Sequence, residues 1–218
     1  MAEPSSETIT QKPRIPMLKH APQTTEETRR SLKWRVVDIA VGAAVGVMSG
    51  VMFWVFDGLS YGLFPLLTLI LPGSAALLHA LFYFPATLGL LIMRKPGASA
   101  YVLLVASFVE VVLGTKYSVS LVVIALVQAL AAEAVFAVFR YRRWTLGVTL
   151  LSAVAIGIVY NFYLLFFYYQ AFSFFSPRGL IGTACELLSA VVFAGFGSWV
   201  LYRALAKSGV LTRFASGR

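Results

Sequence analysis

The chain has 218 residues, of which 59% are hydrophobic and 12% are charged, and it carries a formal net charge of +9. A typical soluble domain has about 25% charged residues. With a mean hydropathy of +0.82, this chain has too little polar surface to be such a domain. Its basic residues fall in short clusters between apolar stretches, which excludes the basic face of a nucleic-acid-binding module. The composition therefore predicts a protein embedded in a lipid bilayer.

The chain divides into two tails and an apolar middle. Residues 1–33 are rich in Thr, Ser, Pro, Glu and Lys, so we expect a disordered tail, and residues 209–218 form a second, short tail. Residues 34–208 predict an all-α, polytopic membrane domain with six transmembrane helices. The expected helices, in chain order, are Val36–Phe56, Ser74–Met93, Ala98–Leu113, Ser118–Phe139, Thr145–Tyr169 and Gly179–Ala206.

The segment between the first two helices is harder to interpret. Asp57–Gly73 is apolar, but it contains Pro65, Pro72 and three glycines. Because proline and glycine interrupt helices, we expect a loop or a short re-entrant piece here and no further span.

The basic residues predict the orientation. With six spans and a cytoplasmic N-terminus, 16 of the 18 Lys and Arg residues lie on the cytoplasmic side, and only Lys116 and Arg178 lie outside. Cytoplasmic loops are enriched in Lys and Arg, and a seventh span would move Arg94 and Lys95 to the outside. We therefore expect both termini in the cytoplasm and a multi-pass protein of the cell membrane.

The first helix carries two rows of small residues. Gly42, Gly46 and Gly50 recur every four residues, as do Ala40 and Ala44. Such rows let helix backbones approach closely. They indicate either packing within the bundle or docking of another membrane subunit, and two rows leave room for both.

Polar side chains within the spans are the candidate functional residues. A carboxylate near the bilayer centre costs about 2.5–3.5 kcal/mol on insertion scales, so Glu110 and Glu133 require a partner, a cavity or a ligand. Glu133 continues a row of alanines, and it either bonds a neighbouring helix or contacts a ligand. The same two interpretations apply to Gln128, which lies near the midplane.

Several polar residues have a similar expected depth in the outer half of the bundle. They are Glu110, His79, Tyr83, Asn161 and Glu186. They can converge on an outward-facing cavity if the bundle brings their faces together. Tyr160 begins an aromatic run that is either an interfacial belt or a stacking wall for a flat heterocycle. Carboxylates beside aromatic rings favour a cationic or amine-bearing ligand.

Catalytic motifs are missing. The sequence has no Walker A, HExxH or GxSxG motif and no metal-ligand spacing, so we expect neither an enzyme nor a metal site. Two kinds of transport protein remain. One is a ligand-binding subunit, and the other is a self-contained proton-coupled carrier or channel for a small amine-bearing solute, with Glu110 and Glu133 as relay groups.

Five segments carry a family resemblance. They are WRVVDIAVGAAVGVMSGVMFW (34–54), MRKPGASA (93–100), FVEVVLG (108–114), LVQALAAEAVFAVFRYRRW (126–144) and RALAKSGVL (203–211). Together they resemble the YkoE family. Its members are the substrate-binding S components of energy-coupling-factor (ECF) vitamin transporters, associated with thiamine or its hydroxymethylpyrimidine precursor.

The resemblance implies a mechanism and partners. The vitamin would bind at the outer face. For this chain we expect Glu110 at the cationic or amino part of the vitamin and Gln128 and Asn161 at ring edges. A transmembrane coupling (T) protein and two ATPase subunits would complete the transporter, so that the partners hydrolyse ATP and this chain needs no cofactor. Ala40 and Ala44 match the docking motif of the family's first helix.

Overall fold

The computed structural model describes residues 32–115, 120–170, 173–209 and 211. Almost all of the two expected tails lies outside these residues. The elements, in chain order, are α1 (Val36–Ile70), η1 (Ser74–Phe82), α2 (Phe84–Met93), α3 (Ala98–Val112), α4 (Ser120–Val138), α5 (Leu146–Phe167), α6 (Pro177–Ser189), η2 (Ala190–Gly197) and α7 (Ser198–Lys207). The described part of the chain is helical and contains no strand.

These elements form six helical segments. Five are long and apolar enough to cross a membrane, namely α1, Ser74–Met93, α4, α5 and Pro177–Lys207, and the sixth, Ala98–Val112, is apolar but shorter. The prediction of an all-α membrane protein with six helices is therefore confirmed. Apart from the end of the first helix, the predicted boundaries agree with the structure to within two residues.

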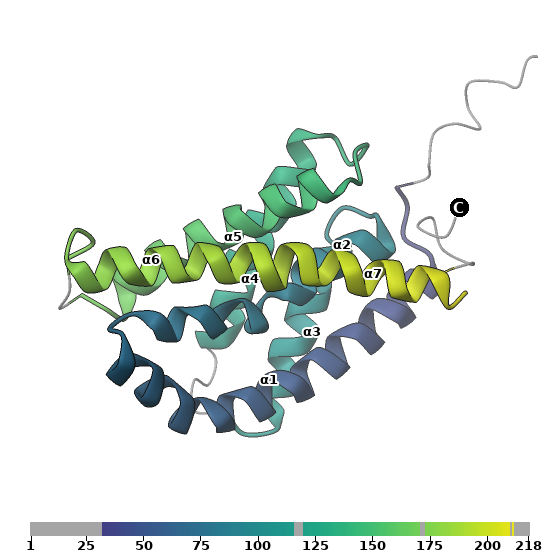
Figure 1. Ribbon diagram of the computed structural model, residues 1–218. Helices are drawn as coiled ribbons and strands as arrows, with labels where there is room; N and C mark the ends of the chain where they lie inside the picture. Colours follow the sequence, from purple (N-terminus) through teal and green to yellow (C-terminus); the bar gives the residue numbers. More distant parts are fainter. Residues whose placement is uncertain (1–31, 116–119, 171–172, 210, 212–218) are drawn as a thin grey trace, which may run out of the picture. The chain divides into compact units, whose positions relative to one another are not determined.

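The prediction of a loop or re-entrant piece at Asp57–Gly73 is wrong. α1 continues as a single helix to Ile70, with Pro65 inside it. A proline removes one helical hydrogen bond, whereas an open loop in an apolar environment would leave many backbone groups without partners. The helix therefore persists and changes direction in its dark-blue second half (Figure 1). This change brings Asp57 and Ser60 into the protein, where both are buried.

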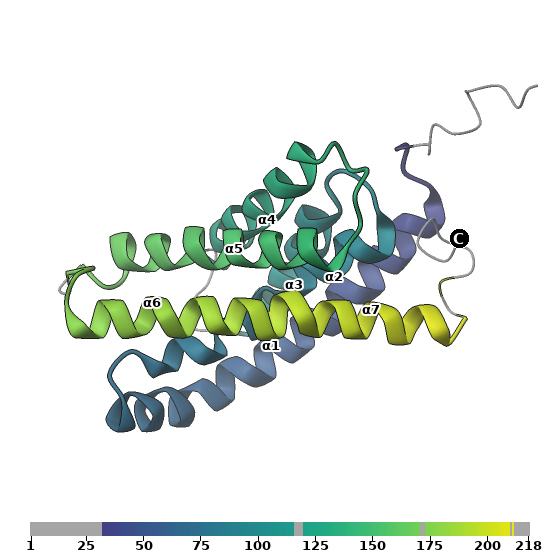
Figure 2. The same ribbon diagram turned by 45° about the horizontal axis from the view of Figure 1, so that its top comes forward.

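Two spans depart from regular α-helix. Ser74–Phe82 is a 3-10 helix, and α2 begins only at Phe84, because Pro85 in its first turn fits a helix start better than an interior. In the last span, η2 is a π-helix between α6 and α7. α6, η2 and α7 nevertheless run as one long rod (Figure 2).

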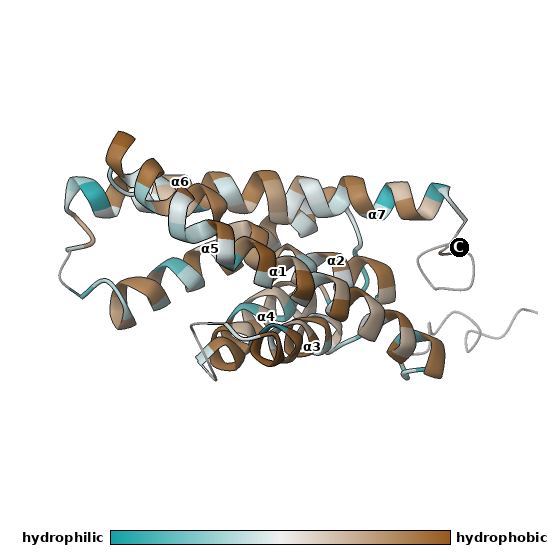
Figure 3. Cartoon of the chain, turned by 90° about the horizontal axis from the view of Figure 1, so that it is seen from below, coloured by the Kyte–Doolittle hydropathy of each residue, from teal (hydrophilic) through white to brown (hydrophobic). Residues whose placement is uncertain are grey.

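α2 lies at the centre of the bundle, where every residue from Pro85 to Met93 is buried. Around it, α1 packs on α3, α3 on α4, α4 on α5, and α5 on α6 and η2. Brown, hydrophobic segments dominate the helices in Figure 3, and large apolar side chains such as Leu69, Val138 and Phe166 are exposed. A surface of this kind suits contact with lipid rather than water.

One end of the bundle carries a cluster of basic residues. The turns after α2 and α4 carry Arg94, Lys95, Arg140, Arg142 and Arg143, and we call this the basic end. At the basic end, Trp34 Nε1 donates to the Pro96 carbonyl at 3.1 Å and Lys95 Nζ donates to the Lys33 carbonyl at 2.8 Å. Burial lowers the pKa of Lys95. These bonds join the start of α1 to the turn before α3.

Candidate functional site

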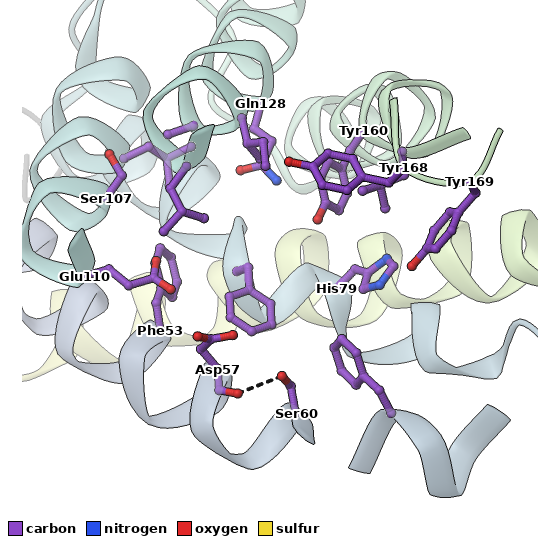
Figure 4. Close-up of a pocket in the computed structure, with 17 residues that line it drawn as sticks. Phe53, Asp57, Ser60, His79, Ser107, Glu110, Gln128, Tyr160, Tyr168 and Tyr169 are labelled. Atoms are coloured by element: carbon purple, nitrogen blue, oxygen red, sulfur yellow. Dashed lines mark hydrogen bonds between the residues drawn. The ribbon is translucent and has the colours of Figure 1, made fainter. Parts of the chain in front are cut away.

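A cavity of about 220 Å³ lies between α1, η1, α3, α4 and α5, away from the basic end. Its polar lining residues are Asp57, Ser60, His79, Ser107, Glu110 and Gln128. Its aromatic lining residues are Phe53, Phe64, Phe82, Tyr160, Tyr168 and Tyr169. The described lining contains two carboxylates and no Lys or Arg, and Figure 4 shows the labelled side chains grouped around the cavity.

Glu110 and Gln128 are the least satisfied polar groups of the cavity. Their residues are only 2% and 3% exposed. Within the described residues, neither side chain has a hydrogen-bond or ion-pair partner. Burying such groups without partners costs free energy. Their position in the cavity wall makes a bound molecule the natural source of those partners.

Asp57 is the second carboxylate, and the sequence analysis missed it because the segment was interpreted as a loop. The continuation of α1 carries it into the cavity wall, where Oδ2 accepts a hydrogen bond from Thr115 at 3.2 Å and the backbone carbonyl accepts one from Ser60 at 2.7 Å (Figure 4). An acid in an otherwise apolar segment was the signal that could have identified it. With Glu110, it makes the cavity attractive to a cation.

Aromatic rings form another side of the cavity. Tyr160 meets the ring of His79 edge to face, with 5.6 Å between centroids, and the ring of Tyr83 at 5.8 Å. Phe82 packs against Phe53 at 5.8 Å. Such faces can stack on a flat heterocycle and stabilise a positive charge.

His79, Tyr83 and Glu186 form a buried cluster behind the cavity. Glu186 is fully buried, and its two oxygens face Nδ1 of His79 at 2.5 Å and the hydroxyl of Tyr83 at 2.8 Å. Of the three, only His79 lines the cavity. The structure thus places Tyr83 and Glu186 behind the cavity wall rather than in it.

Asn161 lines a neighbouring cavity of about 130 Å³, which shares His79, Phe64, Leu164 and Tyr169 with the first. Its side-chain amide donates to the Thr183 hydroxyl at 2.9 Å. Asn161 is therefore adjacent to the main cavity rather than in its wall.

Glu133 lies on α4 between the cavity residue Gln128 and the turn of the basic end. Its Oε1 accepts from the backbone N–H of Ser99 at 3.0 Å, and its Oε2 accepts from the Tyr141 hydroxyl at 2.6 Å. Burial and this hydrogen bond to a carboxylate raise the pKa of Tyr141. Glu133 thus joins α4 to the start of α3 and to its own terminal turn, and the geometry favours its structural interpretation.

The two rows of small residues on α1 face different surroundings. Gly42, Gly46 and Gly50 are buried, and a Cβ at Gly50 would lie 2.5 Å from the Ala106 carbonyl oxygen of α3. Ala40 and Ala44 are exposed. The glycines serve packing within the bundle, which leaves the alanine row on the outer surface of the helix.

The structure therefore groups four predicted residues, Glu110, Gln128, Tyr160 and His79, around one cavity. Asn161 lines the neighbouring cavity. Tyr83 and Glu186 lie behind His79, and Glu133 bonds Ser99 and Tyr141 outside the cavity wall. Within the described residues, no group of three or more His, Cys, Asp or Glu side chains could hold a metal ion.

Comparisons with known proteins agree with one another. The family model described as the permease component of an ABC-type cobalt transport system matches residues 37–159. A protein of Bacillus subtilis (strain 168) that carries the name HMP/thiamine permease protein YkoE is 26% identical over 189 residues, covering 85% of this chain and 91% of that protein.

A solved structure gives the same result. A crystal structure of an S component of an ECF transporter superposes with a TM-score of 0.77 at 27% identity, covering 85% of this chain and 92% of that one. The matched family model spans more than half of the chain. The chain belongs to the family of permease components of ABC-type cobalt transport systems, and within it the chain is an S component of an ECF transporter.

Proposed function

We propose that this S component binds thiamine or a related hydroxymethylpyrimidine in the 220 Å³ cavity. The YkoE relative, whose name includes HMP and thiamine, supports a vitamin of this class. The volume lies below the roughly 300–1,000 Å³ of pockets for drug-sized ligands. A ligand of one or two small rings is consistent with that size.

The observation that carries this proposal is the unpartnered carboxylate of Glu110. It faces a cavity that also holds Asp57 and several aromatic rings, and no Lys or Arg occurs in its described lining. A ligand with a cationic or amino group would supply the missing donor through a charge-assisted hydrogen bond. Gln128 can both donate and accept at the edge of a pyrimidine ring, and Tyr160 offers a ring face for stacking.

The family description names cobalt, which raises the question of whether this chain binds a metal ion. A cobalt ion bound directly by the protein would require several nitrogen, oxygen or sulfur ligands close together. The described residues contain no such group of His, Cys, Asp or Glu. The cavity offers aromatic faces and scattered polar groups, which suit an organic ring better than a metal ion.

The transport step would depend on partner subunits. We propose that the exposed Ala40 and Ala44 dock a transmembrane coupling protein, whose two ATPase subunits hydrolyse ATP, so that this chain requires no cofactor of its own. The basic end would face the cytoplasm in the cell membrane, because Lys and Arg are enriched on that side. The cavity would then open toward the outside, where a vitamin is captured.

Calorimetry on the purified protein in detergent tests the ligand. Thiamine and hydroxymethylpyrimidine are titrated separately, with Co²⁺ as a third titrant. Saturable heat from at least one of the two pyrimidines is the expected result. Heat from Co²⁺ alone, or from none of the three, would contradict the proposal.

Reconstitution tests the dependence on partners. Liposomes that contain only this chain should not accumulate thiamine in a pH gradient. Accumulation under those conditions would favour the self-contained proton-coupled carrier instead.

The docking surface can be tested by enlarging one side chain. Ala44→Leu should abolish co-purification with the coupling protein, because the added bulk prevents close helix approach. Ala134→Leu places the same change on an exposed position of α4 and should leave assembly intact. Equal assembly of both variants would show that the alanine row is not the docking face.

A further inference from the structure

The cluster of His79, Tyr83 and Glu186 controls one hydrogen-bonding atom in the cavity. Glu186 is fully buried and lines neither cavity, while His79 lines both. Tyr83 donates to one carboxylate oxygen, and His79 Nδ1 faces the other at 2.5 Å. Because an ionised carboxylate only accepts hydrogen bonds, Nδ1 is the ring nitrogen that carries the proton toward Glu186.

This arrangement leaves Nε2 of His79 for the cavity. A neutral imidazole has one protonated nitrogen and one acceptor nitrogen, and a carboxylate partner determines which is which. Within the described residues, Nε2 has no hydrogen-bond partner. The ring of His79 also meets the rings of Phe64 and Tyr160 at 5.9 and 5.6 Å between centroids, and ring contacts of this kind do not satisfy a nitrogen lone pair.

We propose that Glu186 is a positioning residue that holds His79 as a hydrogen-bond acceptor toward the cavity, so that His79 selects ligands with an N–H group there. This inference rests on the proposed function and deepens it, because the amino group of an aminopyrimidine is such a donor. In an analogue with an oxygen in place of the amino group, that oxygen would face Nε2 of His79. Both atoms are then hydrogen-bond acceptors, and they repel each other. Sites built around a polar contact reject the analogue that cannot make it.

Thiamine and oxythiamine, which carries an oxygen in place of the pyrimidine amino group, make the test direct. Their dissociation constants are measured by calorimetry with the wild-type chain and with Glu186→Gln. The wild type should favour thiamine by about tenfold or more. In the variant the amide can turn an N–H toward Nδ1, which moves the ring proton to Nε2, so the preference should fall toward one.

Two further variants distinguish a loss of ligand selectivity from a loss of protein stability. His79→Asn keeps a polar group near the Nδ1 position but lacks Nε2, so it should also lose the preference. Ser189→Ala is the matched control, since Ser189 bonds the Ala80 N–H and the Leu77 carbonyl between the same two elements without touching the pair. It should lower thermal stability and leave the thiamine-to-oxythiamine ratio unchanged.

The outcomes separate this inference from the proposed function. If the wild type binds thiamine and the ratio is the same in Glu186→Gln and His79→Asn, the positioning role is overturned while the function stands. A wild-type preference for oxythiamine overturns the acceptor assignment. If the wild type binds neither compound, both proposals fall.

Discussion

Glu110 on α3 and Glu133 on α4 are both buried carboxylates within apolar helices, with exposures of 2% and 9%. Glu133 receives hydrogen bonds from the Ser99 backbone and the Tyr141 hydroxyl. Glu110 receives none from the described residues and lines a cavity with Asp57. Burial alone therefore does not distinguish an acid that bonds within the protein from one that lines a cavity, whereas the presence of protein donors does.

Glu186 extends the comparison to a third case. It is more deeply buried than either of the other two and is satisfied by Tyr83 and His79. It stands one residue away from the cavity rather than in it. The three acids thus form a series in which a carboxylate faces the cavity, faces a residue that lines the cavity, or faces only protein. Replacing each acid should therefore change ligand affinity and protein stability to different extents.

The largest expected effect is on ligand affinity when Glu110 is neutralised. Glu110→Gln removes one charge-assisted hydrogen bond, worth about 1.5–3 kcal/mol, so thiamine affinity should fall roughly 10–150-fold. Because the carboxylate has no protein donor to lose, the melting temperature in detergent should not fall. Calorimetry and thermal unfolding on the same preparation measure both quantities. Unchanged affinity would remove Glu110 from the binding site.

The opposite pattern is expected for Glu133. Glu133→Leu removes both acceptor oxygens, so the buried N–H of Ser99 loses its hydrogen-bond partner. Leaving such a buried group unpaired costs about 1–3 kcal/mol of stability, while thiamine affinity should stay within about threefold of wild type. Unfolding and calorimetry provide the two readings. A large loss of affinity without a loss of stability would reverse the roles that we assign to the two acids.

The depths of these two acids could be predicted from the sequence, but the hydrogen-bond partners of Glu133 could not. The rise of 1.5 Å per residue predicted different depths for Glu110 and Glu133, and in the structure the two side chains have different surroundings. One of the two partners of Glu133, Tyr141, lies in a turn in which Arg140 and Tyr141 have positive φ. Positive φ values are uncommon for residues other than glycine, so the local sequence did not predict this turn.

The helical continuation of α1 was the other unpredictable feature. Pro65 and its neighbouring glycines indicated a break, but the apolar surroundings favour a helix that satisfies its own backbone. Asp57 was lost from the predicted site for that reason. The convergence of His79 with Glu186 was also beyond the sequence, since 107 residues separate them and the packing of η1 against α6 brings them together.

A smaller effect on affinity is expected for Gln128. Gln128→Leu removes a neutral amide, whose hydrogen bonds contribute about 0.5–1.5 kcal/mol each, so thiamine affinity should fall roughly 2–12-fold. The stability should rise or stay constant, because the amide has no partner among the described residues. Calorimetry on Gln128→Leu and Glu110→Gln under the same conditions shows which variant loses more thiamine affinity. A larger loss than that of Glu110→Gln would mean that the amide rather than the charge dominates recognition.

The smallest effect concerns the alkaline stability of the basic end. Burial and the hydrogen bond to Glu133 raise the pKa of Tyr141 in the folded protein. The folded state therefore holds this proton more tightly than the unfolded state, whose tyrosine pKa is about 10. The stabilisation is fully present below that pH and is lost as the pH rises through the higher folded value.

Tyr141→Phe should lower stability by about 1 kcal/mol at neutral pH, and this difference from wild type should shrink above about pH 10. Chemical unfolding of both proteins across the alkaline range measures the difference and cancels the other titrating groups. If Tyr141→Phe and the wild type are equally stable at every pH, Tyr141 stabilises the end of α4 through ring packing alone, and Glu133 is held chiefly by Ser99.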